Sequence, residues 1–146
     1  MRKHVISLAV VGVWAVLGAW LVAGCGDGGS EGVVLESISP SAAAIGAEVT
    51  LHGSGFTDEG NDVGFRNQLI NFQGQHVGYV ASLPSPDGRT LRFTLPAELG
   101  ACAFSQLPPD QPCPAIALGL PAGPSEVFVA NSDGESEGVT FTVTEP

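Results

Sequence analysis

Carboxylate and carboxamide oxygens gather in one short segment, Asp58-Glu59-Gly60-Asn61-Asp62. Oxygen ligands of this kind suit Ca²⁺, so Asp58, Glu59, Asn61 and Asp62 are candidate calcium ligands. The segment lacks the ligand spacing of a helix–loop–helix calcium motif. A turn whose charged side chains face water explains the same residues equally well, and both interpretations stay open here. Apart from this candidate we predict no metal site, and we predict no cofactor.

Residues for acid–base or nucleophilic catalysis are sparse. After residue 4 the histidines are His52 and His76. The segment His52-Gly53-Ser54-Gly55 differs from the Gly-x-Ser-x-Gly pattern of a hydrolase nucleophile. The glycine-rich segments precede no predicted helix, so the sequence holds no phosphate-binding loop. We therefore predict that the chain is not an enzyme and has no catalytic residues.

The N-terminus has the layout of a secretory signal. Arg2 and Lys3 precede a run of apolar or glycine residues over positions 5–24, which only Ser7 interrupts. A positive head, an apolar stretch and small residues follow one another in that order. The segment Leu21-Val22-Ala23-Gly24-Cys25 resembles the lipobox of bacterial lipoproteins.

The resemblance to lipoproteins implies cleavage before Cys25 and acylation of its thiol, with palmitate among the acyl groups. Two or three acyl chains hold a protein on a membrane far better than one. Gly26, in place of an aspartate, implies the outer rather than the inner membrane in a cell with two membranes. We predict a signal peptide at 1–24, the lipidated Cys25 with a flexible tether over 25–32, and a domain over 33–146 that faces the periplasm or the exterior. The alternative is an uncleaved transmembrane anchor, because twenty largely apolar residues could span a bilayer.

Two further cysteines, Cys102 and Cys113, bracket a proline-rich segment. In an exported chain whose third cysteine is lipidated, a disulfide between them is the default. The alternative is a metal site that they form with His52 and His76, although no close ligand spacing supports it.

The charge of the chain excludes one class of partner. Five basic residues against fifteen acidic residues give a net charge of −10. Without residues 1–24 only Arg66, Arg89 and Arg92 remain, so three basic residues face the same fifteen acidic ones, a balance of −12. Binding of nucleic acid through its phosphates is therefore not expected.

From residue 33 onward, short runs alternate apolar and polar residues, and turn residues separate these runs. We expect strands at 35–38, 49–52, 63–65, 91–95, 127–129 and 139–144. A bend or bulge within 35–38 would let Leu35 and Ile38 both face inward. The expected core comprises Leu35, Ile38, Ile45, Val49, Leu51, Phe56, Val63, Phe65, Val80, Leu91, Phe93, Leu95, Val127, Val129, Val139, Phe141 and Val143. Two antiparallel sheets that face each other would bury these side chains.

Four stretches of sequence, taken in order, resemble the IPT/TIG domain found in plexins and transcription factors. They are Leu-Glu-Ser-Ile-Ser-Pro (35–40) with Ile-Gly-Ala-Glu-Val-Thr-Leu-His-Gly-Ser-Gly-Phe (45–56), Asp-Gly-Arg-Thr-Leu-Arg-Phe-Thr-Leu-Pro (87–96), Val-Phe-Val-Ala-Asn-Ser-Asp-Gly-Glu-Ser (127–136) and Val-Thr-Phe-Thr-Val (139–143). The resemblance implies an all-β fold, an immunoglobulin-like (early-set) antiparallel β-sandwich. Such modules serve in adhesion, dimerisation or spacing, so the resemblance does not imply one activity.

Two long connections, 66–78 and 96–124, depart from a minimal sandwich, and long loops on a β scaffold are where specificity is built. Phe72, Tyr79, Phe104 and Phe128 could present aromatic faces to a ligand or partner, or could pack under loops. We expect a non-catalytic, lipid-anchored cell-envelope protein whose domain serves in binding, adhesion or structure. Its partners would be the membrane, through Cys25, and a protein or polysaccharide. The alternative is a carbohydrate-binding module for an envelope or extracellular polysaccharide.

Overall fold

Eleven β-strands and one short 3-10 helix make up residues 32–108 and 110–145, the part of the chain that this computed structural model describes. The elements are β1 (Val34–Ser39), β2 (Ala42–Ala44), β3 (Glu48–Ser54), β4 (Asn61–Arg66), β5 (Val77–Leu83), β6 (Thr90–Thr94), β7 (Glu98–Gly100), η1 (Phe104–Gln106), β8 (Ala117–Gly119), β9 (Gly123–Asn131), β10 (Gly134–Glu135) and β11 (Val139–Thr144). The predicted signal segment 1–24, the lipidation site Cys25 and positions 26–31 of the predicted tether lie outside the described residues. Within the described ranges, no helix has the length and apolar character needed to cross a bilayer.

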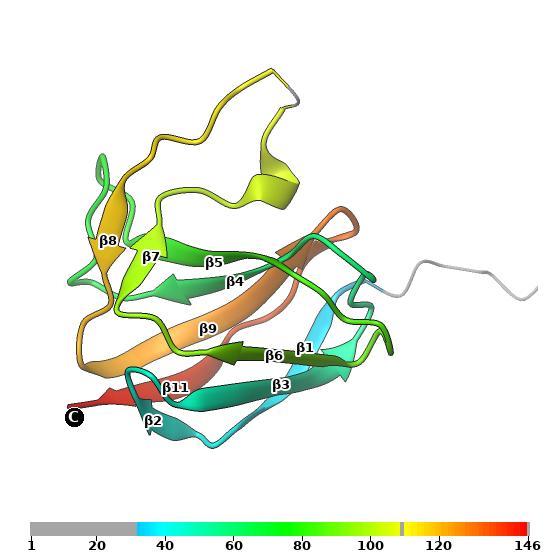
Figure 1. The fold of residues 1–146 in the computed structure, drawn as a ribbon, viewed down its shortest axis with the longest axis horizontal. Helices are drawn as coiled ribbons and strands as arrows, with labels where there is room; N and C mark the ends of the chain where they lie inside the picture. The colour runs from blue at the N-terminus through cyan, green and yellow to red at the C-terminus, as the bar shows by residue number, and fades with distance from the viewer. Residues whose placement is uncertain (1–31, 109, 146) are drawn as a thin grey trace, which may run out of the picture.

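The strands form two sheets that pack face to face (Figure 1). The smaller sheet has the order β1-β3-β6, and the larger has the order β2-β11-β9-β4-β5-β7-β8, with β10 paired to β9. Neighbouring strands are antiparallel except β2, which pairs parallel with β11. The chain therefore folds as the predicted all-β sandwich, and the pairing of β2 with the last strand was not foreseen.

Alternation along the strands builds the core between the sheets. In β3, Val49 and Leu51 are buried while Glu48 and His52 are exposed, because successive side chains of a strand point to opposite faces. Three aromatic rings join the two layers. Phe65 of β4 meets Phe93 of the smaller sheet and Phe141 of β11 edge to face, with ring centroids 6.4 Å apart in both pairs.

The predicted core is correct in most positions, with one clear error. The register of β1 against β3 shifts between Leu35 and Ser37, and this bulge buries both Leu35 and Ile38 as expected. Ile45 is 41% exposed, because it lies in the turn between β2 and β3 rather than on a strand face. Several buried apolar residues were not predicted, namely Val33, Ala43, Ile70, Leu99 and Leu120.

The strand register shows which strands begin or end at each end of the sandwich. The chain enters β1 at Val34, which pairs with Ser54 at the end of β3. The buried side chain of Asn131 donates to Gly55 O at 3.0 Å and to Asn61 Oδ1 at 3.1 Å, so β3 ends where β4 begins and β9 ends. From there β4 runs to the opposite end, where residues 67–76 turn the chain back into β5, as Figure 1 shows.

A second packed group lies on the outer face of the larger sheet. Phe128 of β9 is fully buried there. The Arg66 guanidinium stacks over its ring with Cζ 3.9 Å from the centroid, and the Tyr79 ring meets it edge on at 6.0 Å. Gly64 lies opposite Phe128 in the register of β4 and β9, and a Cβ at Gly64 would overlap the Phe128 ring.

Alternation correctly turned Phe128 away from the main core. Of the two interpretations left open for its ring, the structure bears out packing and not an exposed face for a ligand. Arg66 and Tyr79 cover the ring from above, and the glycine beneath it lets the ring lie against the sheet. Burial of this aromatic area stabilises the outer face in the same way as burial in the core.

We predict that Gly64→Ala lowers the free energy of unfolding by about 1–3 kcal/mol, because an added methyl group must displace the Phe128 ring. The matched control is Gly119→Ala, at a strand position where an added Cβ meets nothing within 4 Å and the backbone is not left-handed. Urea denaturation of both variants measures the difference. Equal stability of the two variants would contradict this account of the outer face.

Candidate functional site

A buried carboxylate anchors the long connection between β7 and β8 to the larger sheet. Asp62 of β4 is fully buried. One of its oxygens accepts hydrogen bonds from the Ser105 backbone N–H at 2.7 Å and from Ser105 Oγ at 2.6 Å. The other oxygen accepts from the Ser82 N–H at 2.9 Å. Because charge-assisted hydrogen bonds are the stronger ones, this single side chain holds η1 and a strained position of β5 together.

The Asp62 carboxylate stabilises an irregular backbone conformation at Ser82. Its backbone is left-handed, with φ of 58°, which is uncommon for residues other than glycine. The register of β4 against β5 shifts between Asn61 and Val63, so Asp62 sits at a bulge beside Ser82. Its hydrogen bond to the Ser82 amide fixes this irregular part of the sheet.

A disulfide closes the same connection. Cys102 and Cys113 are bonded, with Cα atoms 6.0 Å apart, as predicted. Their thiols are therefore not available for the alternative metal site with His52 and His76. We call residues 102–113 the disulfide loop, and Figure 1 shows that the β7–β8 connection rises from the larger sheet on the side away from the smaller one.

A hollow with a volume of about 460 Å³ lies between the disulfide loop and the turn at residues 72–75. We call it the loop hollow. Its lining consists of Phe72, Gln73, Gln75, Tyr79, Ala101, Cys102, Ala103, Gln106, Leu107, Gln111, Pro112 and Pro114. Two aromatic rings, four carboxamides and no charged side chain are found among these residues. The surface that they form suits a ligand that is neutral and offers both apolar faces and hydrogen-bonding groups.

The turn on one side of the loop hollow is a tight hairpin. Phe72 and Gln75 exchange backbone hydrogen bonds of 2.9 Å in both directions. Gln73 and Gly74 between them have φ of 52° and 83°. A two-residue hairpin turn of this kind requires positive φ at both central positions, where asparagine and glycine are preferred. Gln73 therefore holds a strained conformation with its side chain at the edge of the hollow.

Tyr79 is the only titratable side chain that lines the loop hollow in the described residues, apart from the cysteines held in the disulfide. Burial raises the pKa of its hydroxyl above the usual value, and the negative charge of Glu135 raises the pKa further. The phenol is therefore neutral at physiological pH and can both donate and accept a hydrogen bond.

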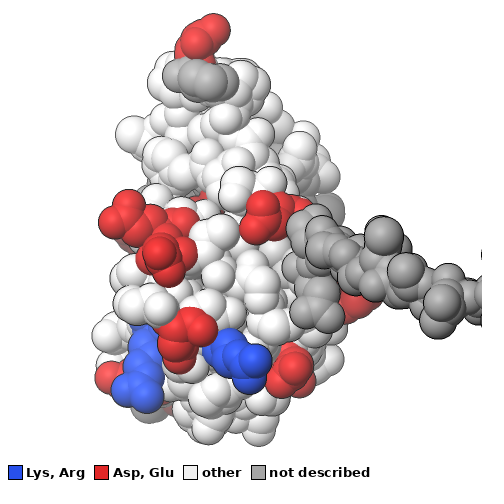
Figure 2. Space-filling view, turned by 90° about the vertical axis from the view of Figure 1, so that its right-hand side faces the viewer, with Lys and Arg blue, Asp and Glu red and all other residues white. Residues whose placement is uncertain are grey.

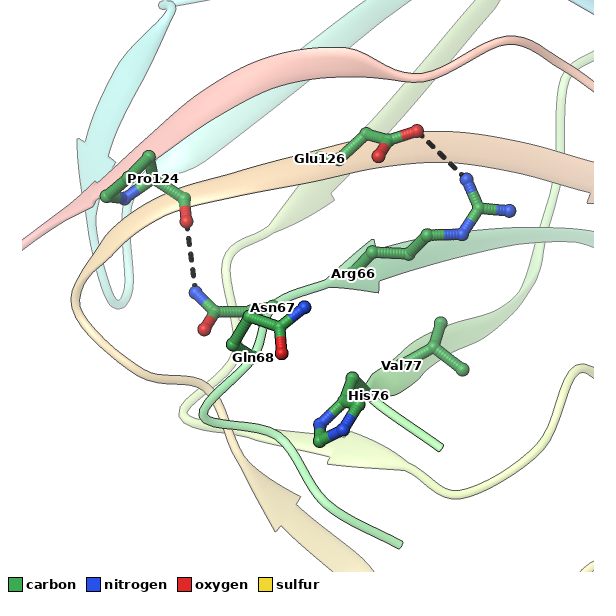
Figure 3. A pocket seen from close by; sticks show the side chains of 7 residues that line it. All are labelled: Arg66, Asn67, Gln68, His76, Val77, Pro124 and Glu126. Carbon is green, nitrogen blue, oxygen red and sulfur yellow. Dashed lines mark hydrogen bonds and ion pairs between the residues drawn. The ribbon is translucent and has the colours of Figure 1, made fainter. Parts of the chain in front are cut away.

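A second hollow, of about 400 Å³, lies beyond the end of β4 and is lined by Arg66, Asn67, Gln68, His76, Val77, Pro124 and Glu126 (Figure 3). Most of its polar groups are already paired within the protein. Asn67 Nδ2 donates to Pro124 O and Ser125 Oγ, both at 3.0 Å. The Arg66 guanidinium forms ion pairs with Glu126, at 3.0 Å, and with Glu135.

His76 also has an internal partner, since its Nδ1 lies 2.6 Å from Ile70 O. A negatively charged ligand in this second hollow would have to compete with the carboxylates of Glu126 and Glu135 for Arg66. The polar groups that line the second hollow therefore stabilise the 67–76 segment. For this reason the second hollow is a poorer candidate for a binding site than the loop hollow.

The structure brings together two of the four aromatic residues singled out from the sequence. Phe72 and Tyr79, both half-buried, line the loop hollow. Phe104 is 54% exposed and lines a different depression with Ile116 and Cys113. Phe128 lies beneath Tyr79 and contributes by supporting it.

The calcium candidates are not brought together. Asp58 and Glu59 are exposed, whereas Asn61 and Asp62 are buried and engaged elsewhere. Asn61 Nδ2 donates to Thr57 O at 2.6 Å and to Leu83 O at 2.9 Å. Across residues 32–108 and 110–145, no three His, Cys, Asp or Glu side chains are grouped in a way that could hold a metal ion.

The glutamines of the loop hollow, Gln73, Gln75, Gln106 and Gln111, were not singled out from the sequence. A lone glutamine in a loop carries no spacing signal, and these four come from two connections that are far apart in the chain. Only the tertiary contact between the 72–75 turn and the disulfide loop makes them one surface. The glutamine content of the two long connections was the only available signal, and it does not specify a site.

Comparisons with known proteins add no further constraint. No family model matches the chain, and no curated protein matches it significantly.

We predict that Asp62→Ala lowers the free energy of unfolding by about 1–3 kcal/mol, because it removes the charged acceptor of the Ser82 and Ser105 amides. Amide hydrogen exchange of Ser105 should become faster even with the disulfide intact. Asp58→Ala, which removes an exposed carboxylate four residues earlier, is the matched control and should change neither quantity. Unchanged exchange at Ser105 in the Asp62 variant would show that the disulfide alone positions the loop.

Proposed function

We propose that this chain is a non-catalytic, lipid-anchored protein of a bacterial cell envelope, and that its sandwich binds a partner through the loop hollow. The observation that carries the proposal is the loop hollow itself. Two loops from different parts of the chain meet there, and each is held in place by a separate restraint. Binding surfaces on β scaffolds are built from such loops.

The restraints on the disulfide loop support a binding role. The Cys102–Cys113 bond closes the loop, and Asp62 fixes η1 to the sheet through Ser105. Neither restraint is needed to bury the core between the sheets, because the buried cluster is formed by residues from the strands and from shorter connections. A loop that is ordered beyond the needs of the core is preorganised, which lowers the entropic cost of binding.

The chemistry of the lining favours binding over catalysis. Tyr79 is neutral at physiological pH, and the remaining polar groups of the lining are carboxamides. Carboxamides neither gain nor lose protons in this range, so they orient ligands and do not transfer protons. His52 lies on the exposed face of β3 in the other sheet, away from the hollow.

The topology supports the family resemblance and the direction of attachment. The first strand pairs in the smaller sheet, and β2 then crosses to run parallel to the last strand. This order is consistent with an immunoglobulin-like sandwich of the IPT/TIG kind. The chain enters at the end of the sandwich opposite the 67–76 segment (Figure 1), so that segment lies at the end of the sandwich farther from the point of attachment.

We predict that the mature protein, expressed in a bacterium that makes lipoproteins, begins at a Cys25 carrying acyl chains. Intact-mass spectrometry and the membrane fraction report this directly. Cys25→Ser should leave residues 1–24 attached, because the thiol that accepts the diacylglycerol is absent. Gly26→Ala, next to the lipidation site, is the control and should be processed normally. An intact Met1 terminus in the unsubstituted protein would overturn the lipid anchor.

We predict that a photo-crosslinking residue at Gln106, on the loop hollow, forms a covalent adduct in intact cells. The matched control is the same residue at Thr50, which lies on β3 in the opposite sheet. Gel mobility and mass spectrometry reveal the adduct. An adduct at Thr50 of equal yield, or none at Gln106, would contradict the assignment of the loop hollow as the binding surface.

A further inference from the structure

We infer that the loop hollow binds a neutral carbohydrate chain; this inference rests on the proposed function and names its ligand class. Three features of the site support it together: the lining is uncharged within a strongly acidic molecule, two aromatic rings face the same hollow, and four free carboxamides surround them.

The first feature is charge. The chain beyond residue 24 carries fifteen acidic and three basic residues, yet the segment 101–119, which comprises the β7–β8 connection and β8, contains one charged residue, Asp110. Figure 2 shows acidic side chains spread over the face of the sandwich, while its upper part, formed by the disulfide loop, is almost entirely uncharged. Arg66, the basic residue on the outer face of the larger sheet, is neutralised by Glu126 and Glu135. A uronic acid or a phosphate would therefore be repelled by the molecule and find no cation in the hollow.

The second feature is the pair of rings. Phe72 and Tyr79 are half-buried, so each is fixed by packing and still offers part of its ring to the hollow. The C–H face of a sugar ring is apolar, and its contact with an aromatic ring removes apolar area from water. Tyr79 is held rigidly against Phe128, and the Phe72 backbone is fixed by its hairpin bonds to Gln75.

The third feature is the set of carboxamides. Gln73, Gln75, Gln106 and Gln111 are exposed, and in the described part of the chain their side chains make no hydrogen bond within the protein. A carboxamide presents two donors and an acceptor, and a sugar hydroxyl is also both donor and acceptor. A purely apolar ligand would cover these groups without pairing them, and burial of unpaired polar groups is unfavourable. A polyhydroxylated chain satisfies them.

The backbone strain at Gln73 also supports a ligand-binding role for this side chain. Glycine or asparagine would relieve the left-handed conformation at this position of the turn. Strain of this kind is found at ligand sites, where a particular side chain is needed. We therefore expect Gln73→Gly to preserve or raise stability and to weaken carbohydrate binding, a combination that a purely structural role for Gln73 would not produce.

The test is binding of the full-length chain, solubilised in detergent, to four neutral polysaccharides (dextran, amylose, mannan and galactan) and to the acidic polymers alginate and polygalacturonate. The same chain is also bound to isolated envelopes of the cells that produce it, before and after treatment with periodate or protease. Periodate cleaves vicinal diols of sugars, and protease removes proteins. We expect binding to at least one neutral polymer, none to the acidic polymers, and loss of envelope binding after periodate alone.

Substitutions in and outside the loop hollow test whether the carbohydrate binds there. Phe72→Ala and the double variant Gln106→Ala/Gln111→Ala should each weaken binding by at least about tenfold, which is about 1.4 kcal/mol. Tyr79→Phe keeps the ring that covers Phe128 and removes only the hydroxyl, so it tests that hydroxyl without disturbing the fold. Phe104→Ala removes an exposed ring outside the loop hollow and should leave binding unchanged.

The outcomes separate this inference from the proposed function. Envelope binding that survives periodate and is lost with protease would overturn the carbohydrate inference while the loop hollow remains a binding surface. Binding to the acidic polymers as strongly as to the neutral ones would also overturn it. Absence of envelope binding, together with no adduct at Gln106, would overturn both.

Discussion

The three hydrogen bonds to the Asp62 carboxylate are the interaction on which the candidate site depends. They tie η1 and the bulged part of β5 to the centre of the larger sheet. A buried carboxylate is unfavourable unless donors surround it, and here the donors come from two different segments, η1 and β5. The disulfide limits the spread of the loop, and Asp62 fixes the position of η1 on the sheet through Ser105. The loop hollow is the space that this placement leaves above Tyr79.

Much of the sandwich could be predicted from the sequence, because the alternation of apolar and polar residues indicates which face of a strand is buried. β3, β6 and β11 follow strict alternation, and the irregular spacing of Leu35 and Ile38 correctly indicated a bulge. The short β2, β7 and β8 could not be predicted, since three residues are too few to show a period. β5 was missed because its residues are mostly half-buried and include Gly78 and the left-handed Ser82. Phe128 shows a further limit: alternation gives the side of the sheet but not what covers that side.

The candidate site could be predicted only in outline. Two long connections and four aromatic residues were visible, and two of the four rings line the hollow. The glutamines could not be found, because they become neighbours only through tertiary contacts between distant loops. The acidic segment at 58–62 does not form the calcium site that was considered from the sequence. Its last two residues begin β4, where successive side chains point to opposite faces. Asn61 donates to the Leu83 carbonyl and Asp62 accepts from the Ser82 amide, so the two side chains do not face one another around a cation.

Both ends of the larger sheet are closed by strands of three residues, β2 and β8. An unpaired margin of a sheet is a template on which another chain can add, and such growth leads to fibrils. Three residues offer too few amide and carbonyl groups to hold an incoming strand, and the prolines near β8, Pro114 and Pro121, interrupt the row on either side. The larger sheet thereby resists growth by strand addition at its two margins, while the hollow on its flank stays accessible.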